Sequence, residues 1–420
     1  MAVAEENPPA YATSLADIER AAEVLKGHVV RTPLIAAPKL SALAGADIYI
    51  KYENLQFTNS FKDRGAYLKL DSLTGEERER GVIAISAGNH AQAVAYHASR
   101  LGIPAVIVMP EGTPFVKVGN TEALGAEVVL AGETLTESRE TADEIARERD
   151  LTFVHPYDDP LVITGQGTVA LEMLADRSDL DTIVIPIGGG GLIAGSAIAA
   201  KALKPDIDIV GVEVDFFPSM YHAVRGEEPK CGGQTLAEGI AVKAAGEYTL
   251  PIVRDLVSDI VLVDEAAIER AICTLLNVQK TMAEGAGAAV LAALTKEPER
   301  FEGRKAGLVL TGGNIDPRML ASIVMRGLEY EEKIVSLRLR ITDKPGVLGS
   351  IASMLGKAGA NILEVSHRRT FLDVPAKGAT LDIVIETKDA AHAAQVMDKM
   401  RKAGFEVKRR SGSDGDFGAY

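Results

Sequence analysis

The chain has 420 residues, with 45 basic and 59 acidic side chains and a net charge of −14. This length predicts two or three domains, and 47% hydrophobic with 25% charged residues excludes a mainly disordered chain. The acidic balance argues against nucleic acid or an anionic membrane as a partner. Two cysteines are too few for a disulfide framework. We expect a cytoplasmic protein, because the N-terminus lacks a signal-peptide pattern and no apolar run approaches a bilayer span.

The first three quarters of the chain alternate apolar, strand-length runs with helical segments. The runs lie at 46–51, 81–86, 104–110, 126–132, 182–188, 208–214 and 306–313. Helical segments include 90–101, with apolar residues every three to four positions, and 136–149. Strands separated by helices of this length predict a buried parallel sheet with right-handed crossovers. The fold class is therefore α/β, which by itself names no reaction.

A charged segment at 326–333 is the expected linker to a second region. Beyond it, residues 334–342 alternate apolar and polar side chains, as a half-buried antiparallel strand does. A βαββαβ order is completed by helices at 347–358 and 389–403 and by strands near 361–371, 379–387 and 405–410. This order predicts a ferredoxin-like domain over 334–410. The polar tail at 411–420 is assigned no structure.

The segment ENLQFTNSFKDRGA at 53–66 places Lys62 beside Phe61 at the start of a helix. Lysines usually lie on solvated surfaces, and that interpretation stays open. The alternative is an amine partly shielded from water, whose lowered pKa would let it form a Schiff base. Asn59 and Ser60 are suited to cap the helix and to direct backbone N–H groups toward an anion.

The segment ISAGNHAQAVAYH at 85–97 predicts a strand, a polar turn and a helix. Ser86, Gly88, Asn89 and His90 stand where the strand ends and the helix begins, the position at which open parallel sheets bind ligands. Backbone N–H groups there would suit a carboxylate. An ordinary turn capped by Asn89 explains the pattern equally well, and His90 alone is better explained as a structural residue.

Four successive glycines, 188–191, separate a predicted strand from a helix. Such a loop lets the backbone wrap a phosphate at the helix N-terminus. The stretch also satisfies G-x-G-x-x-A, with Glu213 ending the next strand, which is the pattern of a dinucleotide site. A nicotinamide-binding dehydrogenase is therefore an alternative from another enzyme class, although it leaves Lys62 and Asn89 without a role.

The segment AGLVLTGGNIDP at 306–317 ends a predicted strand at Thr311. A hydroxyl there would hydrogen-bond a heterocycle without forcing it to stay protonated, as a carboxylate would. A strand-ending threonine with no functional role fits the pattern equally well.

Together and in this order, these segments resemble the fold type II (tryptophan-synthase-β-like) pyridoxal phosphate enzymes, and among them the threonine dehydratases (threonine ammonia-lyases). The resemblance rests on SFK and RG at 60–65, SAGNH at 86–90, PYDDP at 156–160, the glycines with Leu192, and TGGN at 311–314. It implies a two-lobed catalytic region over 1–325, with a smaller lobe at roughly 53–155 and without a metal ion. DKPGVLG at 343–349 and ANI at 360–362 make the C-terminal region similar to an ACT domain, a small-molecule sensor.

The resemblance implies a role for each matching residue. Lys62 would hold pyridoxal 5'-phosphate as a Schiff base and shuttle the substrate's α-proton, with Phe61 beside the ring. Asn89 would hydrogen-bond the 3-hydroxyl of the pyridine, and Thr311 would face its nitrogen. The phosphate would bind the amides of Gly188, Gly189, Gly190, Gly191 and Leu192. The substrate carboxylate would bind the loop of Ser86, Gly88, Asn89 and His90.

The implied reaction is β-elimination of L-threonine to 2-oxobutanoate and ammonia, with pyruvate formed from L-serine as a side activity. A neutral hydroxyl at the ring nitrogen limits delocalisation of the carbanion, which favours elimination over racemisation. Ala87 stands where related serine racemases are expected to carry a serine, which also argues against racemisation. A lyase or racemase for serine or another 3-hydroxy amino acid is the alternative within the family. Asp63, where an apolar residue would be expected, has no assigned role.

The ACT-like region implies allosteric control by a branched-chain amino acid, isoleucine first and valine as counter-effector. The enzyme would then take the first step toward isoleucine. The effector would bind Asp343, Gly346, Val347, Leu348, Asn361 and Ile362. A dimerisation module that binds nothing is the alternative. Family habit implies a homodimer or homotetramer.

Overall fold

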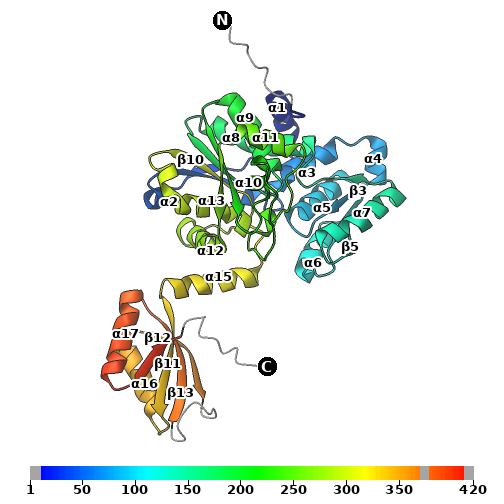
Figure 1. The fold of residues 1–420 in the computed structure, drawn as a ribbon. Helices are drawn as coiled ribbons and strands as arrows, with labels where there is room; N and C mark the ends of the chain where they lie inside the picture. Colours follow the sequence, from blue (N-terminus) through cyan, green and yellow to red (C-terminus); the bar gives the residue numbers. More distant parts are fainter. Residues whose placement is uncertain (1–10, 369–377, 411–420) are drawn as a thin grey trace. The chain divides into compact units, whose positions relative to one another are not determined.

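The computed structural model describes residues 11–368 and 378–410. The chain separates into two compact units, Met1–Ile315 and Asp316–Tyr420 (Figure 1). The N-terminal unit contains two mainly parallel sheets, and the C-terminal unit contains one antiparallel sheet. Within the described ranges, no helix has both the length and the apolar character to span a membrane.

The larger sheet of the N-terminal unit has six strands in the order β1-β2-β10-β7-β8-β9. All neighbouring strands are parallel except β1 and β2. The strands are β1 (Leu34–Ala36), β2 (Asp47–Tyr52), β7 (Thr182–Pro186), β8 (Asp208–Val214), β9 (Asp259–Val263) and β10 (Lys305–Leu310). Strands β7 and β8 are buried almost throughout, which explains their continuous apolar sequences. The predicted α/β class is confirmed, and β1 and β9 are strands that the sequence analysis did not identify.

Nine helices of the described residues pack with this sheet or with one another. They are α1 (Leu15–Leu25), α2 (Pro38–Ala44), α8 (Pro160–Asp176), α9 (Gly191–Leu203), α10 (Ser219–Val224), α11 (Thr249–Leu256), α12 (Glu265–Thr274), α13 (Gly285–Lys296) and α14 (Pro298–Phe301). The described residues also contain the 3-10 helices η1 (Glu53–Leu55) and η2 (Glu238–Ile240) and the π-helix η3 (Leu275–Gln279). Helices α8 and α9 enclose a large apolar core with the strands of the sheet.

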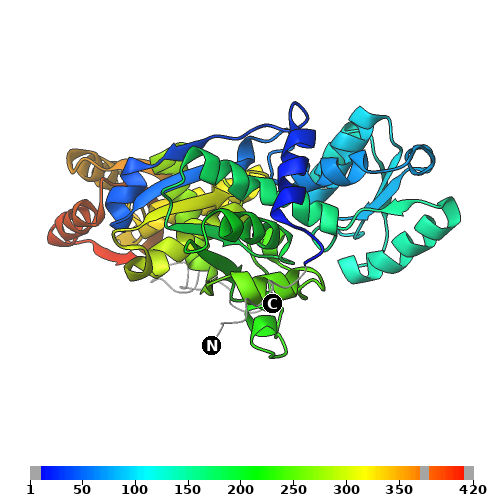
Figure 2. The same ribbon diagram turned by 90° about the horizontal axis from the view of Figure 1, so that it is seen from above.

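The smaller sheet has the order β5-β4-β3-β6, and all its strands are parallel. Its strands are β3 (Val82–Ile85), β4 (Ala105–Met109), β5 (Glu127–Leu130) and β6 (Thr152–Phe153). Its helices are α3 (Lys62–Asp71), α4 (Gly75–Arg80), α5 (Asn89–Leu101), α6 (Phe115–Ala123) and α7 (Leu135–Arg149). Figure 2 shows this lobe in cyan tones beside the larger sheet.

Glycines let helix backbones touch, both within the larger lobe and between the two lobes. A Cβ atom on Gly195 of α9 would lie 2.1 Å from the carbonyl oxygen of Ile163 in α8. A Cβ atom on Gly165 of α8 would lie 2.8 Å from the carbonyl oxygen of Arg64 in α3. Larger residues are excluded at both positions, because a Cβ atom at either distance would overlap the carbonyl oxygen. Helix α3, which begins at Lys62, therefore packs in direct backbone contact with α8.

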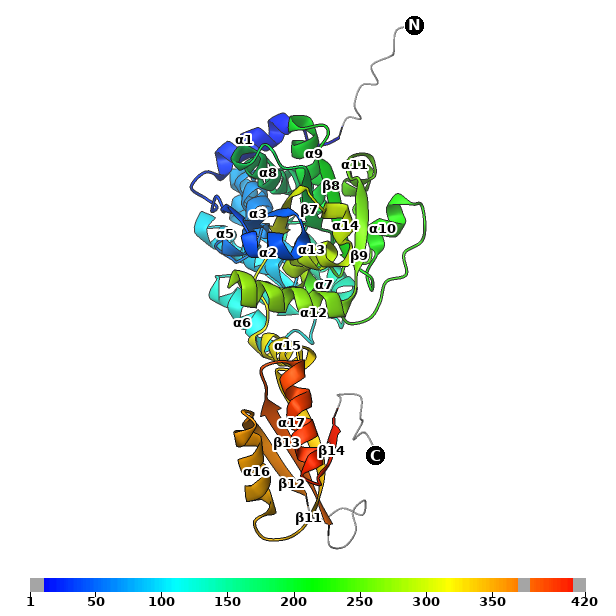
Figure 3. The same ribbon diagram turned by 90° about the vertical axis from the view of Figure 1, so that its left-hand side faces the viewer.

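The C-terminal unit begins with α15 (Pro317–Tyr330) and continues as a βαββαβ fold. Its elements are β11 (Ile334–Thr342), α16 (Val347–Lys357), β12 (Asn361–Arg368), β13 (Gly378–Glu386), α17 (Ala390–Lys402) and β14 (Glu406–Arg409). The antiparallel order β12-β13-β11-β14 fits the predicted ferredoxin-like fold. Helices α16 and α17 pack on one face of this sheet (Figure 3). Residues 326–330 of the expected linker continue α15, and the tail at 411–420 lies outside the described residues.

Candidate active site

Lys62 is the first residue of α3, and its amine lies in a partly shielded position. Its Nζ donates a hydrogen bond to the carbonyl oxygen of Pro156 at 2.5 Å and lies 5.2 Å from the ring centre of Phe61. Burial lowers the pKa of Lys62 to about 8, and the negative potential of Glu284 opposes this shift. About a tenth of the amine is therefore neutral, and nucleophilic, at pH 7, far more than for an ordinary lysine.

A buried ionic network fixes the start of α3. Arg64 is fully buried and pairs with Glu53, Nη2 to Oε1 at 2.8 Å, and with Glu172, Nη1 to Oε1 at 2.7 Å. Lys51 pairs with Glu172 at 2.5 Å. Although burial alone would raise it, Arg64 and Lys51 hold the pKa of Glu53 below its usual value. The network thereby ties α3 to β2, η1 and α8, two residues from Lys62.

Asp63, to which the sequence analysis assigned no role, holds the turn before α3. Its carboxylate accepts hydrogen bonds from the backbone N–H of Thr58 at 2.9 Å and from the Thr58 hydroxyl at 2.6 Å. His97 Nε2 lies 3.3 Å from Asp63 Oδ1. The same turn places Asn59 in the left-handed region, with φ of 57°. Asp63 is fully buried, so its function is to shape the chain that presents Lys62.

The glycine loop presents successive backbone donors between β7 and α9. In the described part of the chain, none of the N–H groups of residues 188–192 donates to a protein acceptor. Gly190 has φ of 97°, a conformation that favours glycine. A Cβ atom on Gly189 would lie 2.2 Å from ring carbons of Tyr157. A helix N-terminus with free amides in a row is suited to bind a phosphate group.

The PYDDP segment joins the glycine loop to Lys62. Pro156 accepts the hydrogen bond of the lysine amine, and Tyr157 packs against Gly189. Asp158 accepts hydrogen bonds from the backbone N–H groups of residues 247–249, at 2.8–3.3 Å. Asp159 caps α8 and pairs with Lys69 at 2.7 Å. These contacts hold the segment in place between the glycine loop and the lysine amine.

The SAGNH turn joins β3 to α5, as its sequence predicts. Ser86 Oγ accepts from the backbone N–H of Gly88 at 3.1 Å. The buried ring of His90 has its Nε2 at 2.9 Å from the carbonyl oxygen of Val154, and burial lowers its pKa to about 3. His90 is therefore neutral at ordinary pH, and its ring is engaged within the protein.

Asn89 has a partner that the sequence analysis missed. Its Nδ2 donates to Oε1 of Glu284 at 2.6 Å, and its Oδ1 accepts from Nδ2 of Asn314 at 2.8 Å. Burial raises the pKa of Glu284 to about 7, and the hydrogen bond from Asn89 opposes this shift. The surrounding sequence, MAEGAG, carries no pattern that would mark this glutamate.

Thr311 lies just beyond the end of β10, and the chain of Phe61 passes beside it. The N–H of Phe61 donates to the carbonyl oxygen of Thr311 at 3.0 Å, and Ser60 forms an isolated antiparallel β-bridge with Gly312. The Thr311 hydroxyl has no protein partner within the described ranges. The structure therefore brings the four predicted segments together at the carboxyl ends of both sheets, as expected for a ligand site in open α/β folds.

Glu213, the acid of the dinucleotide alternative, is already engaged. Its carboxylate is fully buried and accepts hydrogen bonds from the N–H groups of Met220 and Tyr221, each at 2.8 Å. Burial raises its pKa to about 7. It caps the turn into α10, so its oxygens are already engaged by backbone donors of that turn.

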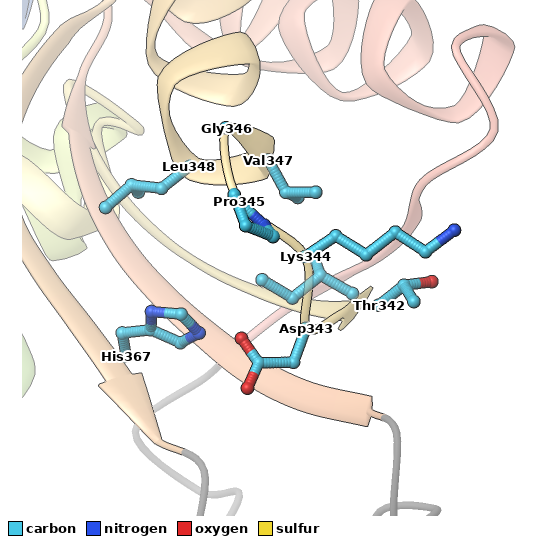
Figure 4. Close-up of a pocket in the computed structure, with 9 residues that line it drawn as sticks. Thr342, Asp343, Lys344, Pro345, Gly346, Val347, Leu348 and His367 are labelled. Atoms are coloured by element: carbon cyan, nitrogen blue, oxygen red, sulfur yellow. The ribbon is translucent and has the colours of Figure 1, made fainter.

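A separate pocket lies in the C-terminal unit where β11 turns into α16 (Figure 4). It encloses about 350 Å³ and is lined by residues 341–348 and His367. Figure 4 shows the side chains of Asp343 and His367 directed toward one another beneath the turn. Of the residues expected to bind an effector, Asp343, Gly346, Val347 and Leu348 line it, whereas Asn361 and Ile362 do not. Asn361 instead donates to Glu386 at 3.2 Å.

Comparison with known proteins decides the family. Residues 25–312 match the family described as "Pyridoxal-phosphate dependent enzyme", and residues 335–405 match the ACT domain. This chain belongs to the pyridoxal phosphate-dependent enzymes and carries a C-terminal ACT domain.

Its relatives match between 73% and 94% of its length. L-threonine ammonia-lyase of Thermotoga maritima is 42% identical over 94% of this chain and 99% of the relative. Among solved structures, the processed form of threonine deaminase isoform 2 from Solanum lycopersicum has a TM-score of 0.70 at 37% identity, covering 74% of this chain and 86% of that one. Serine racemase from Dictyostelium discoideum has a TM-score of 0.69 at 33% identity, covering 73% and 99%.

The residues present fit pyridoxal phosphate. The row of amides without acceptors in the glycine loop matches its phosphate, and the shielded amine of Lys62 matches its aldehyde. The Thr311 hydroxyl, which has no described protein partner, provides a neutral group for a ring nitrogen.

Proposed function

We propose that this enzyme deaminates L-threonine to 2-oxobutanoate and ammonia by eliminating the β-hydroxyl group. The proposal is supported by a 42% identical relative named L-threonine ammonia-lyase that aligns over 94% of the chain. The observation that carries the chemistry is the shielded amine of Lys62, held at the start of α3 beside the glycine loop.

Each described group has a task in this proposal. Lys62 would bind the cofactor covalently and, once released, take the α-proton of the substrate on Nζ. The amides of residues 188–192 would hold the phosphate, and Phe61 would lie beside the ring. Asn89 would donate to the ring oxygen, and the Thr311 hydroxyl would meet the ring nitrogen. When bound, the cofactor supplies an electron-withdrawing conjugated system next to the Cα atom.

The substrate carboxylate would lie on the turn from Ser86 to His90 at the N-terminus of α5. Backbone N–H groups and the hydroxyl of Ser86 would bind it there. His90 would contribute through its backbone, because its ring is hydrogen-bonded to Val154. This placement would point the substrate's α-proton toward Lys62.

L-serine would be a second substrate of the same site, giving pyruvate. Racemisation of serine is the alternative reaction, and it is suggested by the 33% identity to a serine racemase. Ala87 has no hydroxyl that would return a proton from the opposite side of the substrate. Elimination without racemisation is therefore the expected outcome.

The ACT domain suggests feedback control, with the β11–α16 pocket binding isoleucine as inhibitor and valine as counter-effector. The enzyme would then serve the first step toward isoleucine, as a cytoplasmic homodimer or homotetramer. Regulation requires that the effector bind one conformation more tightly than another. The Asp343 carboxylate would meet the ammonium group of such an effector, so Asp343→Ala should weaken the response to isoleucine.

The deciding experiment measures 2-oxobutanoate release from L-threonine, with and without L-isoleucine. Lys62→Ala should abolish turnover and leave the far-UV circular dichroism spectrum unchanged. The control Lys39→Ala, on the exposed surface of α2, should turn over L-threonine at the wild-type rate. Turnover by Lys62→Ala at the wild-type rate would refute the mechanism. Turnover indifferent to isoleucine would retain the lyase and reject the proposed effector.

A further inference from the structure

The side-chain amide of Asn89 is held from both ends. Its Nδ2 donates to Glu284 Oε1 at 2.6 Å, and its Oδ1 accepts from Asn314 Nδ2 at 2.8 Å. Asn314 Nδ2 also donates to the carbonyl oxygen of Thr58 at 2.8 Å. A carbonyl oxygen only accepts, so the chemistry assigns the orientation of both amides. The nitrogen of Asn89 therefore faces Glu284.

Glu284 is itself fixed at the N-terminus of α13. Its backbone N–H donates to the carbonyl oxygen of Gly312 at 3.1 Å. A Cβ atom at Gly312 would lie 2.3 Å from Glu284 Oε1, so only glycine leaves room for the carboxyl group there. Burial raises the pKa of Glu284 to about 7, yet Oε1 can accept a hydrogen bond in either protonation state.

The amide nitrogen of Asn89 carries two hydrogen atoms, and Glu284 uses one of them. The other has no acceptor among the described protein groups. Since Glu284 and Asn314 together stop the amide from rotating, the direction of this second N–H is set by the protein. Asn89 stands at the start of α5, and its Nδ2 would lie 3.2 Å from a Cβ atom built on Gly312.

We infer that Glu284 is a positioning residue that holds Asn89 so that its second N–H meets the ring oxygen of pyridoxal phosphate. The inference rests on the cofactor contact proposed for Asn89. It assigns Glu284 no proton transfer: the carboxyl group acts only as a fixed acceptor. An isosteric side chain that keeps one acceptor oxygen should therefore replace it.

Two variants separate positioning from acid–base chemistry. Glu284→Gln keeps an oxygen that can accept from Asn89 and should bind the cofactor within about threefold of wild type. Glu284→Ala frees the amide and should weaken cofactor binding about tenfold to a hundredfold, the range of one hydrogen bond to a charged group. Titration of the apoenzyme with pyridoxal phosphate, followed by absorbance, measures this binding without substrate. The absorption maximum of the bound cofactor should shift in Glu284→Ala and stay unchanged in Glu284→Gln, because it reports on the hydrogen bond to the ring oxygen.

A matched control tests the effect of charge alone. The carboxylate of Glu238, on neighbouring η2, raises the pKa of Glu284 but does not contact Asn89. Glu238→Gln removes this negative charge and leaves the contacts of Asn89 in place. Its cofactor affinity and spectrum should equal those of wild type. If Glu284→Ala fails to fold, Asn314→Ala removes the opposite clamp and should give the same spectral shift.

Two results would overturn the inference. Wild-type affinity and spectrum in Glu284→Ala, or in the substitute Asn314→Ala, would show that Asn89 needs no clamp. Equal impairment in Glu284→Gln and Glu284→Ala would show that an ionisable carboxyl group is required. Neither result depends on threonine, so a failure of the proposed substrate is distinguished from a failure of this inference.

Discussion

Replacing Gly189 by alanine tests the glycine loop most directly. The added Cβ atom would lie 2.2 Å from Cδ2 and Cε2 of Tyr157, whereas unstrained carbon atoms rest at about 3.5–4.0 Å. Relief requires the loop or the ring to move by more than an ångström. Movement of the ring is restrained, because the Tyr157 hydroxyl donates to the carbonyl oxygen of Ala244 at 3.4 Å and Asp158 anchors the adjacent backbone to residues 247–249. We therefore expect the loop to move.

Gly189→Ala should lower both the stability of the protein and its affinity for the cofactor, through two separate effects. Overpacking of a filled interior lowers the free energy of unfolding by about 1–3 kcal/mol. Movement of the loop withdraws at least one amide from the phosphate, and a hydrogen bond to a charged group is worth about 2 kcal/mol. Cofactor binding should therefore weaken at least about thirtyfold.

The assay combines urea denaturation of the apoenzyme with titration by pyridoxal phosphate. Gly119→Ala is the matched control, since Gly119 lies in α6 with no atom within 4 Å of its added Cβ. It should raise the unfolding free energy by about 0.5–1 kcal/mol and leave cofactor affinity unchanged. Adding Tyr157→Ala to Gly189→Ala should restore part of the affinity. Wild-type stability and affinity in Gly189→Ala would refute the reasoning.

Three further predictions concern the start of α3. Burial lowers the pKa of Lys62 to about 8, and only the neutral amine attacks an aldehyde, so the rate of cofactor capture by the apoenzyme should fall about tenfold per pH unit below pH 8 and level off above it. Stopped-flow absorbance measures this rate. A plateau reached only above about pH 10 would contradict the shielding of the amine. Glu53→Gln removes one of the two carboxylates around buried Arg64 and should lower the unfolding free energy by about 3–5 kcal/mol in urea denaturation; a loss below about 1 kcal/mol would mean that the network does not stabilise the fold. Asp63→Ala removes both hydrogen bonds to Thr58 and should lower the unfolding free energy by about 1.5–3 kcal/mol, with unchanged stability as the contrary result.

Much of this fold could be predicted because its signals are local. The apolar runs of β7 and β8 indicate buried parallel strands, and the alternation in β11 indicates a strand with one solvated face. The ends of these strands carry the glycine loop and Thr311, so their place at the sheet edge follows from topology. Strand β6 has two residues and β1 has three, too few for periodicity to show.

Local sequence patterns were enough to predict the fold class and the glycine loop, since each depends on neighbours within one segment. The solvated and shielded settings of Lys62 were both compatible with its sequence, and the burial of its amine was settled by folding. Only the tertiary structure decided what Asp63, Glu213 and Glu284 do. Their side chains gain a function from contacts whose geometry the local pattern does not encode: Glu284 meets Asn89 across 195 residues of chain. A buried carboxyl group takes its role from the donors that folding places around it, and those donors come from distant segments.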